Sequence, residues 1–99
     1  MNKQKVCNLL GLAQRAGKII SGEEMVVKAI QEQKAKLVFL AHDAAPNLTK
    51  KIQDKSHYYQ VEVITVFSTL ELSIAVGKSR KVLAVTDAGF TKKMRSLME

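Results

Sequence analysis

The amino-acid sequence predicts an α/β protein, a three-layer α/β/α sandwich with helices on both faces of a small, mixed sheet. Leu37–Ala41 is continuously apolar, as expected for a strand that is covered on both faces, and Val61–Val66 and Val82–Thr86 are two further strands. Segments with the helical spacing of apolar residues separate these strands. Helices that alternate with buried strands are typical of layered α/β folds.

The first predicted helix ends at Gly17, which suits a left-handed cap, and a short strand follows at Ile19–Ile20. The buried face of that helix consists of residues at i, i+3, i+4 and i+7: Val6, Leu9, Leu10 and Ala13. The segment 21–24 has the form of a capping box, in which the Ser21 hydroxyl caps the third amide and Glu24 reaches back. The helix that follows has an apolar face made of Met25, Val26, Ala29 and Ile30.

Three further helices are predicted after the strand at Leu37–Ala41. Pro46 suits the first turn of a helix that runs through Tyr59. The segment 68–71 repeats the capping-box pattern, and its helix ends at Gly77. A last helix starts near residues 87–89, and its inner side carries Phe90, Met94 and Leu97.

Length and composition predict one domain that stays in the cytoplasm. Ninety-nine residues, 46% of them hydrophobic, suffice for one core without a metal or a disulfide. The single cysteine, Cys7, cannot form an internal disulfide and lies in an apolar helical pattern, which indicates a small core residue in a reducing compartment. No apolar run approaches the roughly 18 residues of a membrane span.

The charge balance favours a polyanionic partner. Sixteen Lys and Arg oppose nine Asp and Glu, giving a formal net charge of +7. Repulsion among the excess positive charges destabilises the compact state, so such an excess usually serves to bind a polyanion, most often a nucleic acid. A membrane surface, or no polyanion at all, are the alternatives.

The sequence lacks the motifs of an enzyme. There is no G-x-G-x-x-G and no P-loop, and two histidines with one cysteine give no metal-ligand spacing. His42-Asp43 follows a strand, but it suits a solvated loop end, and Asp43 could cap the turn before Pro46. Asp87 suits the cap of the helix that follows it. We therefore expect no catalytic residue, no metal and no cofactor.

The basic residues cluster at turns and favour two candidate contact regions. Lys78, Arg80 and Lys81 lie between a helix end and a strand, where they suit either a phosphate contact or the dipole of the preceding helix. The helix start at Gly22 offers free amides and partial positive charge, and glycine lets a nucleic-acid backbone approach closely. Ordinary dipole stabilisation by Glu23 and Glu24 explains the same residues.

These residues carry a resemblance to a known family. Residues 21–30, Ser-Gly-Glu-Glu-Met-Val-Val-Lys-Ala-Ile, resemble the G-x-N-E-x-x-K-A motif of the kink-turn RNA-binding ribosomal proteins, the large-subunit "seven-Ae" and "thirty-e" type. The strand and loop at 35–46 and the helix at 70–77 are similar to that family's in order and spacing. The end of the chain resembles the short bacterial, ribosomal-protein-like members.

The resemblance implies a three-layer α/β/α fold that binds kink-turn RNA, a bent duplex with tandem G·A pairs. We expect a single RNA-binding domain over residues 1–99 and a monomer. Glu24 and Met25 stand where the family has asparagine and glutamate, and Lys78 replaces a residue that is often apolar. The RNA would be ribosomal RNA or an mRNA leader, and the alternative is a protein-interaction module of the same fold. The expected RNA-contacting residues are Gly22, Glu23, Glu24, Met25, Lys28, Lys36, Thr69, Lys78, Ser79 and Arg80.

Overall fold

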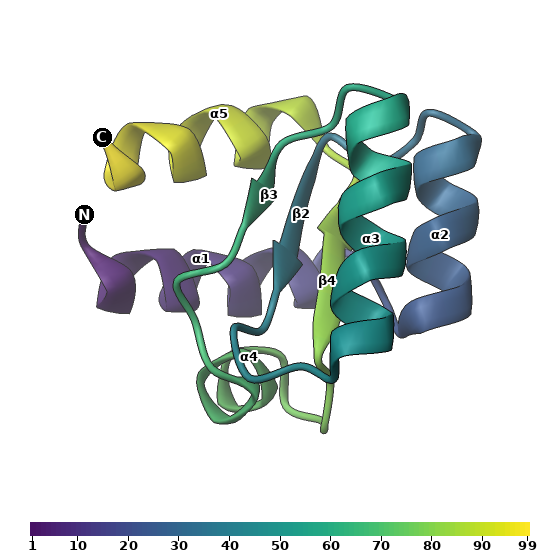
Figure 1. Cartoon of the computed structure of the whole chain (residues 1–99). Helices are drawn as coiled ribbons and strands as arrows, with labels where there is room; N and C mark the ends of the chain where they lie inside the picture. Colours follow the sequence, from purple (N-terminus) through teal and green to yellow (C-terminus); the bar gives the residue numbers. More distant parts are fainter.

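The computed structural model describes residues 1–99, which form five helices and a four-stranded sheet (Figure 1). The sheet has the order β1-β4-β2-β3, with β1 at Ile19–Ser21, β4 at Val82–Val85, β2 at Leu37–Leu40 and β3 at Val63–Ile64. β4 runs antiparallel to both β1 and β2, whereas β2 and β3 are parallel. The predicted small, mixed sheet is confirmed.

Helices cover both faces of this sheet. α1 (Lys3–Arg15), α4 (Thr69–Val76) and α5 (Ala88–Met98) lie on one face, and α2 (Glu23–Gln31) and α3 (Pro46–Tyr58) lie on the other (Figure 1). The molecule measures 28 × 25 × 25 Å along its principal axes. The predicted three-layer sandwich is confirmed.

The buried strands supply both layers of the core. Side chains alternate between the two faces of a strand. Leu37 and Phe39 of β2 therefore pack with α1, α4 and α5, whereas Val38 and Leu40 pack with α2 and α3. All four are at most 1% exposed, which explains why this strand is apolar at every position.

The first helix ends as its glycine predicts. Gly17 has φ +73°, and its N–H donates to the carbonyl of Gln14 at 3.1 Å. The N–H of Lys18 donates to the carbonyl of Ala13 at 2.9 Å. This pair of hydrogen bonds is a Schellman motif, which places Lys18 directly before β1.

The caps of α4 and α5 are also confirmed. The Ser68 hydroxyl accepts from the N–H of Glu71 at 3.1 Å, and the Glu71 carboxylate accepts from the N–H of Ser68 at 2.9 Å. α4 ends at Gly77, which has φ +79°. The Asp87 carboxylate accepts from the N–H of Phe90 at 2.8 Å and so caps α5.

The predicted capping box at the start of α2 is wrong. Ser21 is still a strand residue, paired with Leu83, so its hydroxyl does not cap the helix. Gly22 is the N-cap, and no side chain caps the amides that follow it. Met25, predicted for the inner face of α2, is 56% exposed, because Val26, Ala29 and Ile30 already fill the contact with the sheet.

The third strand is shorter than the predicted Val61–Val66. Only Val63 and Ile64 pair with β2. The chain then leaves the sheet to bury the ring of Phe67, which packs edge-on against Phe39 with 5.7 Å between ring centroids. β3 is thus two residues shorter than predicted at each end, and at its C-terminal end the chain turns away so that the Phe67 ring fills the core beneath α4.

Candidate nucleic-acid interface

Three chain segments meet at one end of the sheet. β1 and β2 end there, and β4 begins there because it runs antiparallel to both. Gly22 follows β1, the segment 41–45 follows β2, and the segment 77–81 precedes β4. An open hollow at this end, which we call the helix-start hollow, is lined by Ser21, Gly22, Glu23, Ala45, Leu48, Ser79, Arg80 and Lys81.

Gly22 gives the hollow its open backbone. Its φ of +94° and ψ of 151° form a combination that side-chain-bearing residues rarely adopt. A Cβ built on Gly22 would have no protein atom within 4 Å, so the space in front of this backbone is open. The uncapped first-turn amides of α2 therefore face a region that an anionic ligand can reach.

Arg80 is held beside the helix start by several hydrogen bonds. Its Nε donates to the Ser21 hydroxyl at 2.9 Å, and its Nη1 donates to the Ser79 carbonyl at 2.7 Å. Its backbone N–H donates to the hydroxyl of Ser73 on α4 at 3.0 Å. Five of the sixteen Lys and Arg side chains form ion pairs, and Arg80 is not among them. Its charge is oriented but not neutralised by a carboxylate.

The two glutamates at the helix start have different surroundings. Glu23 accepts a hydrogen bond from Lys51 Nζ at 2.6 Å, and this bond between α2 and α3 raises the pKa of Lys51. The pair offsets the negative charge of Glu23 beside Gly22. Glu24 is exposed and forms no ion pair, so its carboxylate is free to accept hydrogen bonds from a ligand.

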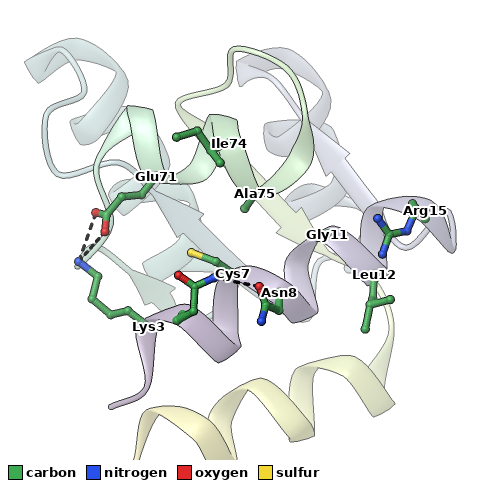
Figure 2. Close-up of a pocket in the computed structure, with 10 residues that line it drawn as sticks. Lys3, Cys7, Asn8, Gly11, Leu12, Arg15, Glu71, Ile74 and Ala75 are labelled. Atoms are coloured by element: carbon green, nitrogen blue, oxygen red, sulfur yellow. Dashed lines mark hydrogen bonds and ion pairs between the residues drawn. The ribbon is translucent and has the colours of Figure 1, made fainter.

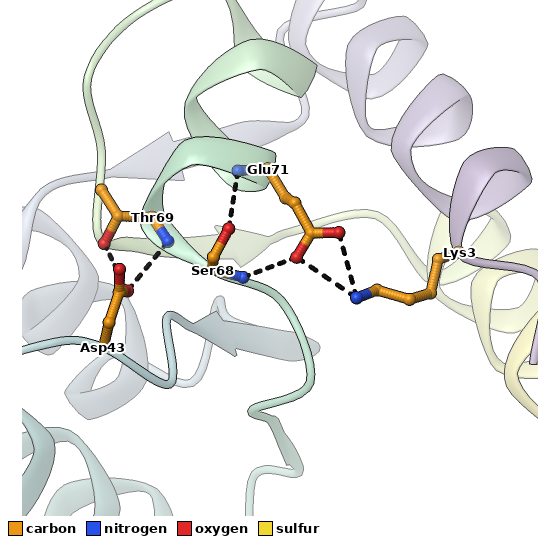
Figure 3. Close-up of polar contacts among 5 residues, drawn as sticks. All are labelled: Lys3, Asp43, Ser68, Thr69 and Glu71. Carbon is orange, nitrogen blue, oxygen red and sulfur yellow. Dashed lines mark hydrogen bonds and ion pairs between the residues drawn. The ribbon is translucent and has the colours of Figure 1, made fainter.

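A neighbouring hollow, which we call the α4 hollow, lies on the other side of Ser79. It is lined by Asp43, Thr69, Leu70, Ser73, Ile74, Gly77, Lys78 and Ser79. Figure 3 shows Asp43 accepting from both the N–H and the hydroxyl of Thr69, at 2.9 and 2.7 Å. These bonds, chiefly the one from the hydroxyl, lower the pKa of Asp43. The alternative prediction that Asp43 caps the turn before Pro46 is wrong, because its carboxylate ties the end of β2 to the start of α4.

On the far side of α4, Glu71 joins the helix to α1. Its carboxylate pairs with Lys3 Nζ at 3.0 Å, and the bond from the N–H of Ser68, together with Lys3, lowers the pKa of Glu71 (Figure 3). Figure 2 shows the groove between α1 and α4 at this place, with Cys7 facing α4. Burial, mainly, raises the pKa of the Cys7 thiol, which agrees with a packing role for that residue.

The structure brings most of the predicted RNA-contacting residues together and leaves one apart. Six of them line the two adjoining hollows: Gly22, Glu23, Thr69, Lys78, Ser79 and Arg80. Glu24, Met25 and Lys28 line neither hollow and lie exposed on α2. Lys36 precedes β2 and donates its N–H to the carbonyl of Val85, so it lies at the opposite end of the sheet, where it shares a hollow with Lys92.

The residues that hold the site in place were not found from the sequence. Ser21 binds Arg80 from 59 residues away, and Ser73 binds it across the turn that follows α4; no sequence pattern marks either bond. Asp43 stands out in the sequence because it directly follows a buried strand, but its partner Thr69 is 26 residues away. A polar residue directly after a buried strand was the one available signal.

No helix has both the length and the apolar character needed to cross a membrane. No group of three or more His, Cys, Asp or Glu side chains is arranged to hold a metal ion.

Comparison with known proteins decides the family. The model of the ribosomal protein L7Ae/L30e/S12e/Gadd45 family matches residues 4–95. The chain belongs to this family. It is 50% identical to the RNA-binding protein YlxQ of Enterococcus faecium, over 99% of this chain and 95% of that protein, and 49% identical to YlxQ of Bacillus subtilis, over 92% of each. The family resemblance seen in the sequence is confirmed.

A solved structure has the same fold as this chain. The 15.5kD RNA binding protein of Giardia lamblia superposes with a TM-score of 0.83 at 18% identity, covering 95% of this chain and 82% of that one. This likeness confirms the family fold. The relatives are described as RNA-binding and ribosomal proteins and not as enzymes, in agreement with the prediction of a non-enzymatic protein.

Proposed function

We propose that this protein binds structured RNA of the kink-turn type, as a cytoplasmic monomer, through the sheet end that carries the two hollows. The observation that supports it most is the placement of Arg80 beside the open backbone of Gly22. A guanidinium that is already oriented loses little side-chain freedom when it binds phosphate. The names of the YlxQ relatives point to the same class of ligand.

Each part of the site has a distinct task in this proposal. The uncapped amides after Gly22 and the unpaired cations Lys78, Arg80 and Lys81 bind backbone phosphates. Glu24 accepts hydrogen bonds from base edges at non-canonical pairs. The major groove of an A-form duplex is too narrow for side chains, so a bend with such pairs is a better target than a straight duplex.

The position of Lys36 limits the extent of the interface. It lies at the far end of the sheet, on the side where β4 ends. The proposed contact surface therefore comprises the helix-start hollow, the α4 hollow and the exposed first turns of α2, and it leaves Lys36 out.

The test compares two RNAs of equal length and charge. One carries a kink turn, and the other replaces its tandem G·A pairs with Watson–Crick pairs. We expect the kink-turn RNA to bind at least about tenfold more tightly, which corresponds to about 1.4 kcal/mol. Equal affinities would remove kink-turn selectivity, and no binding to either RNA would contradict the proposed function as a whole.

A further inference from the structure

α4 presents an apolar face to solvent. Leu70 and Ile74 are 68% and 73% exposed, the highest values among the large aliphatic side chains of the molecule. They lie four residues apart, so they share one side of the helix. A surface helix normally turns polar residues outward. Two such side chains alone are not unusual on a protein surface, so a ligand is indicated only by what surrounds them.

This face is continuous with the proposed RNA site. Leu70 and Ile74 line the α4 hollow together with Lys78 and Ser79. Ser79 also lines the helix-start hollow, so the two depressions adjoin. An RNA strand whose phosphate meets Lys78 would bring its neighbouring nucleotide over Leu70 and Ile74.

The hollow also offers a hydrogen-bond acceptor beside its apolar surface. Both bonds from Thr69 end on Oδ1 of Asp43 and leave Oδ2 without a hydrogen bond to another residue. The amino or imino group of a base is a suitable donor to that oxygen. The hollow therefore matches the three parts of one nucleotide. The apolar side chains fit the face of the base, Lys78 fits the phosphate, and the Asp43 carboxylate fits the polar edge of the base.

No aromatic side chain is available to stack on a base in either hollow. Phe39 and Phe67 are fully buried. Tyr58 and Tyr59 pack edge-on against each other at the end of α3, with 4.9 Å between ring centroids. Aliphatic side chains are thus the apolar contacts that this interface can offer to an unstacked base.

We propose that an unstacked nucleobase of the bound RNA packs on Leu70 and Ile74, with Lys78 on its phosphate. This inference rests on the proposed function and goes beyond it, because it assigns a base-binding subsite to the outer face of α4. RNA recognition commonly uses unstacked bases that are splayed out of the duplex.

The test is a double-mutant cycle on a kink-turn RNA. The protein is either wild type or the double variant Leu70→Ala, Ile74→Ala, which keeps good helix-forming residues in α4. The RNA is either intact or carries an abasic site, placed in turn at each unpaired nucleotide of the bend. Leu12→Ala removes an exposed apolar side chain of α1 outside the α4 hollow and serves as the control.

We expect the double variant to bind intact RNA roughly 5- to 10-fold more weakly, which is the lower end of what stacking on an aromatic side chain contributes. One abasic position should abolish that difference, and Leu12→Ala should bind as wild type. Unchanged affinity of the double variant, or the same loss on every abasic RNA, overturns this inference and points to a protein partner for the α4 face. If wild type does not bind the intact RNA, the proposed function itself has failed.

Discussion

Replacing Gly22 with valine should lower both the stability of the protein and its affinity for RNA, for two different reasons. The native φ of +94° and ψ of 151° cost a residue with a side chain about 1–3 kcal/mol. A small domain has about 5 kcal/mol or more of stability, so most molecules of Gly22→Val stay folded. The new side chain occupies the open space before the α2 amides, where we expect the RNA backbone. Losing one charge-assisted contact there costs about 1.5–3 kcal/mol, a fall in affinity of about 10- to 100-fold.

Gly17→Val is the matched control for this change. Gly17 also has a positive φ, +73°, and no protein atom lies within 4 Å of a Cβ built on it. It lies before β1, at the end of the sheet away from the proposed interface. Urea unfolding should show a loss of stability in both variants, whereas a gel-shift titration should show weaker RNA binding only for Gly22→Val. Equal affinities for the two folded variants would refute the placement of RNA at the helix start.

Three further outcomes are expected from the same structure. Lys78→Ala should reduce the steepness of the plot of log affinity against log salt concentration by about 0.9, the value for one phosphate contact in a duplex. Lys93→Ala on α5 should leave the slope unchanged. Equal slopes for Lys78→Ala and wild type would place the segment 77–81 away from phosphate. The pKa of Asp43 is lowered in the folded state, so its stabilising effect is complete above the ordinary carboxyl pKa and is lost as pH falls through the folded value. In Asp43→Asn the free energy of unfolding should therefore fall less steeply as the pH is lowered than in wild type. The same pH dependence in both proteins would show that Asp43 does not contribute to it. Ser68→Ala should cost about 1 kcal/mol in urea unfolding by removing the α4 cap, and a loss well below about 0.5 kcal/mol would show that the cap contributes little.

The fold was predictable because its signals are local. The apolar run of β2, the glycine after α1 and the capping box at Ser68 each act within a few residues, and the structure confirms all three. The capping box predicted at Ser21 failed for a physical reason. The sequence pattern does not show that β1 extends through Ser21, so the helix starts one residue later, with Gly22 as its N-cap, and the Ser21 hydroxyl accepts from Arg80 instead.

The site was predictable only in part. Gly22 and Lys78 stand out in the sequence because a helix start and a basic turn are local features. Their grouping depends on the strand order, which brings the end of β1 beside the start of β4. The same strand order separates Lys36 from them, although its charge and its position beside a strand looked equally suitable. The sequence gives the number of charged residues, but only the strand order shows which of them lie together on the surface.

The most direct test of the central claim is an NMR titration of the backbone amides with kink-turn RNA. We expect the largest shifts on the first turn of α2, from Gly22 to Met25, and on the segment 77–81, whereas the amides around Lys36 and along α5 change little. Large shifts around Lys36 and α5, with Gly22 unchanged, would show that the RNA binds at the opposite end of the sheet.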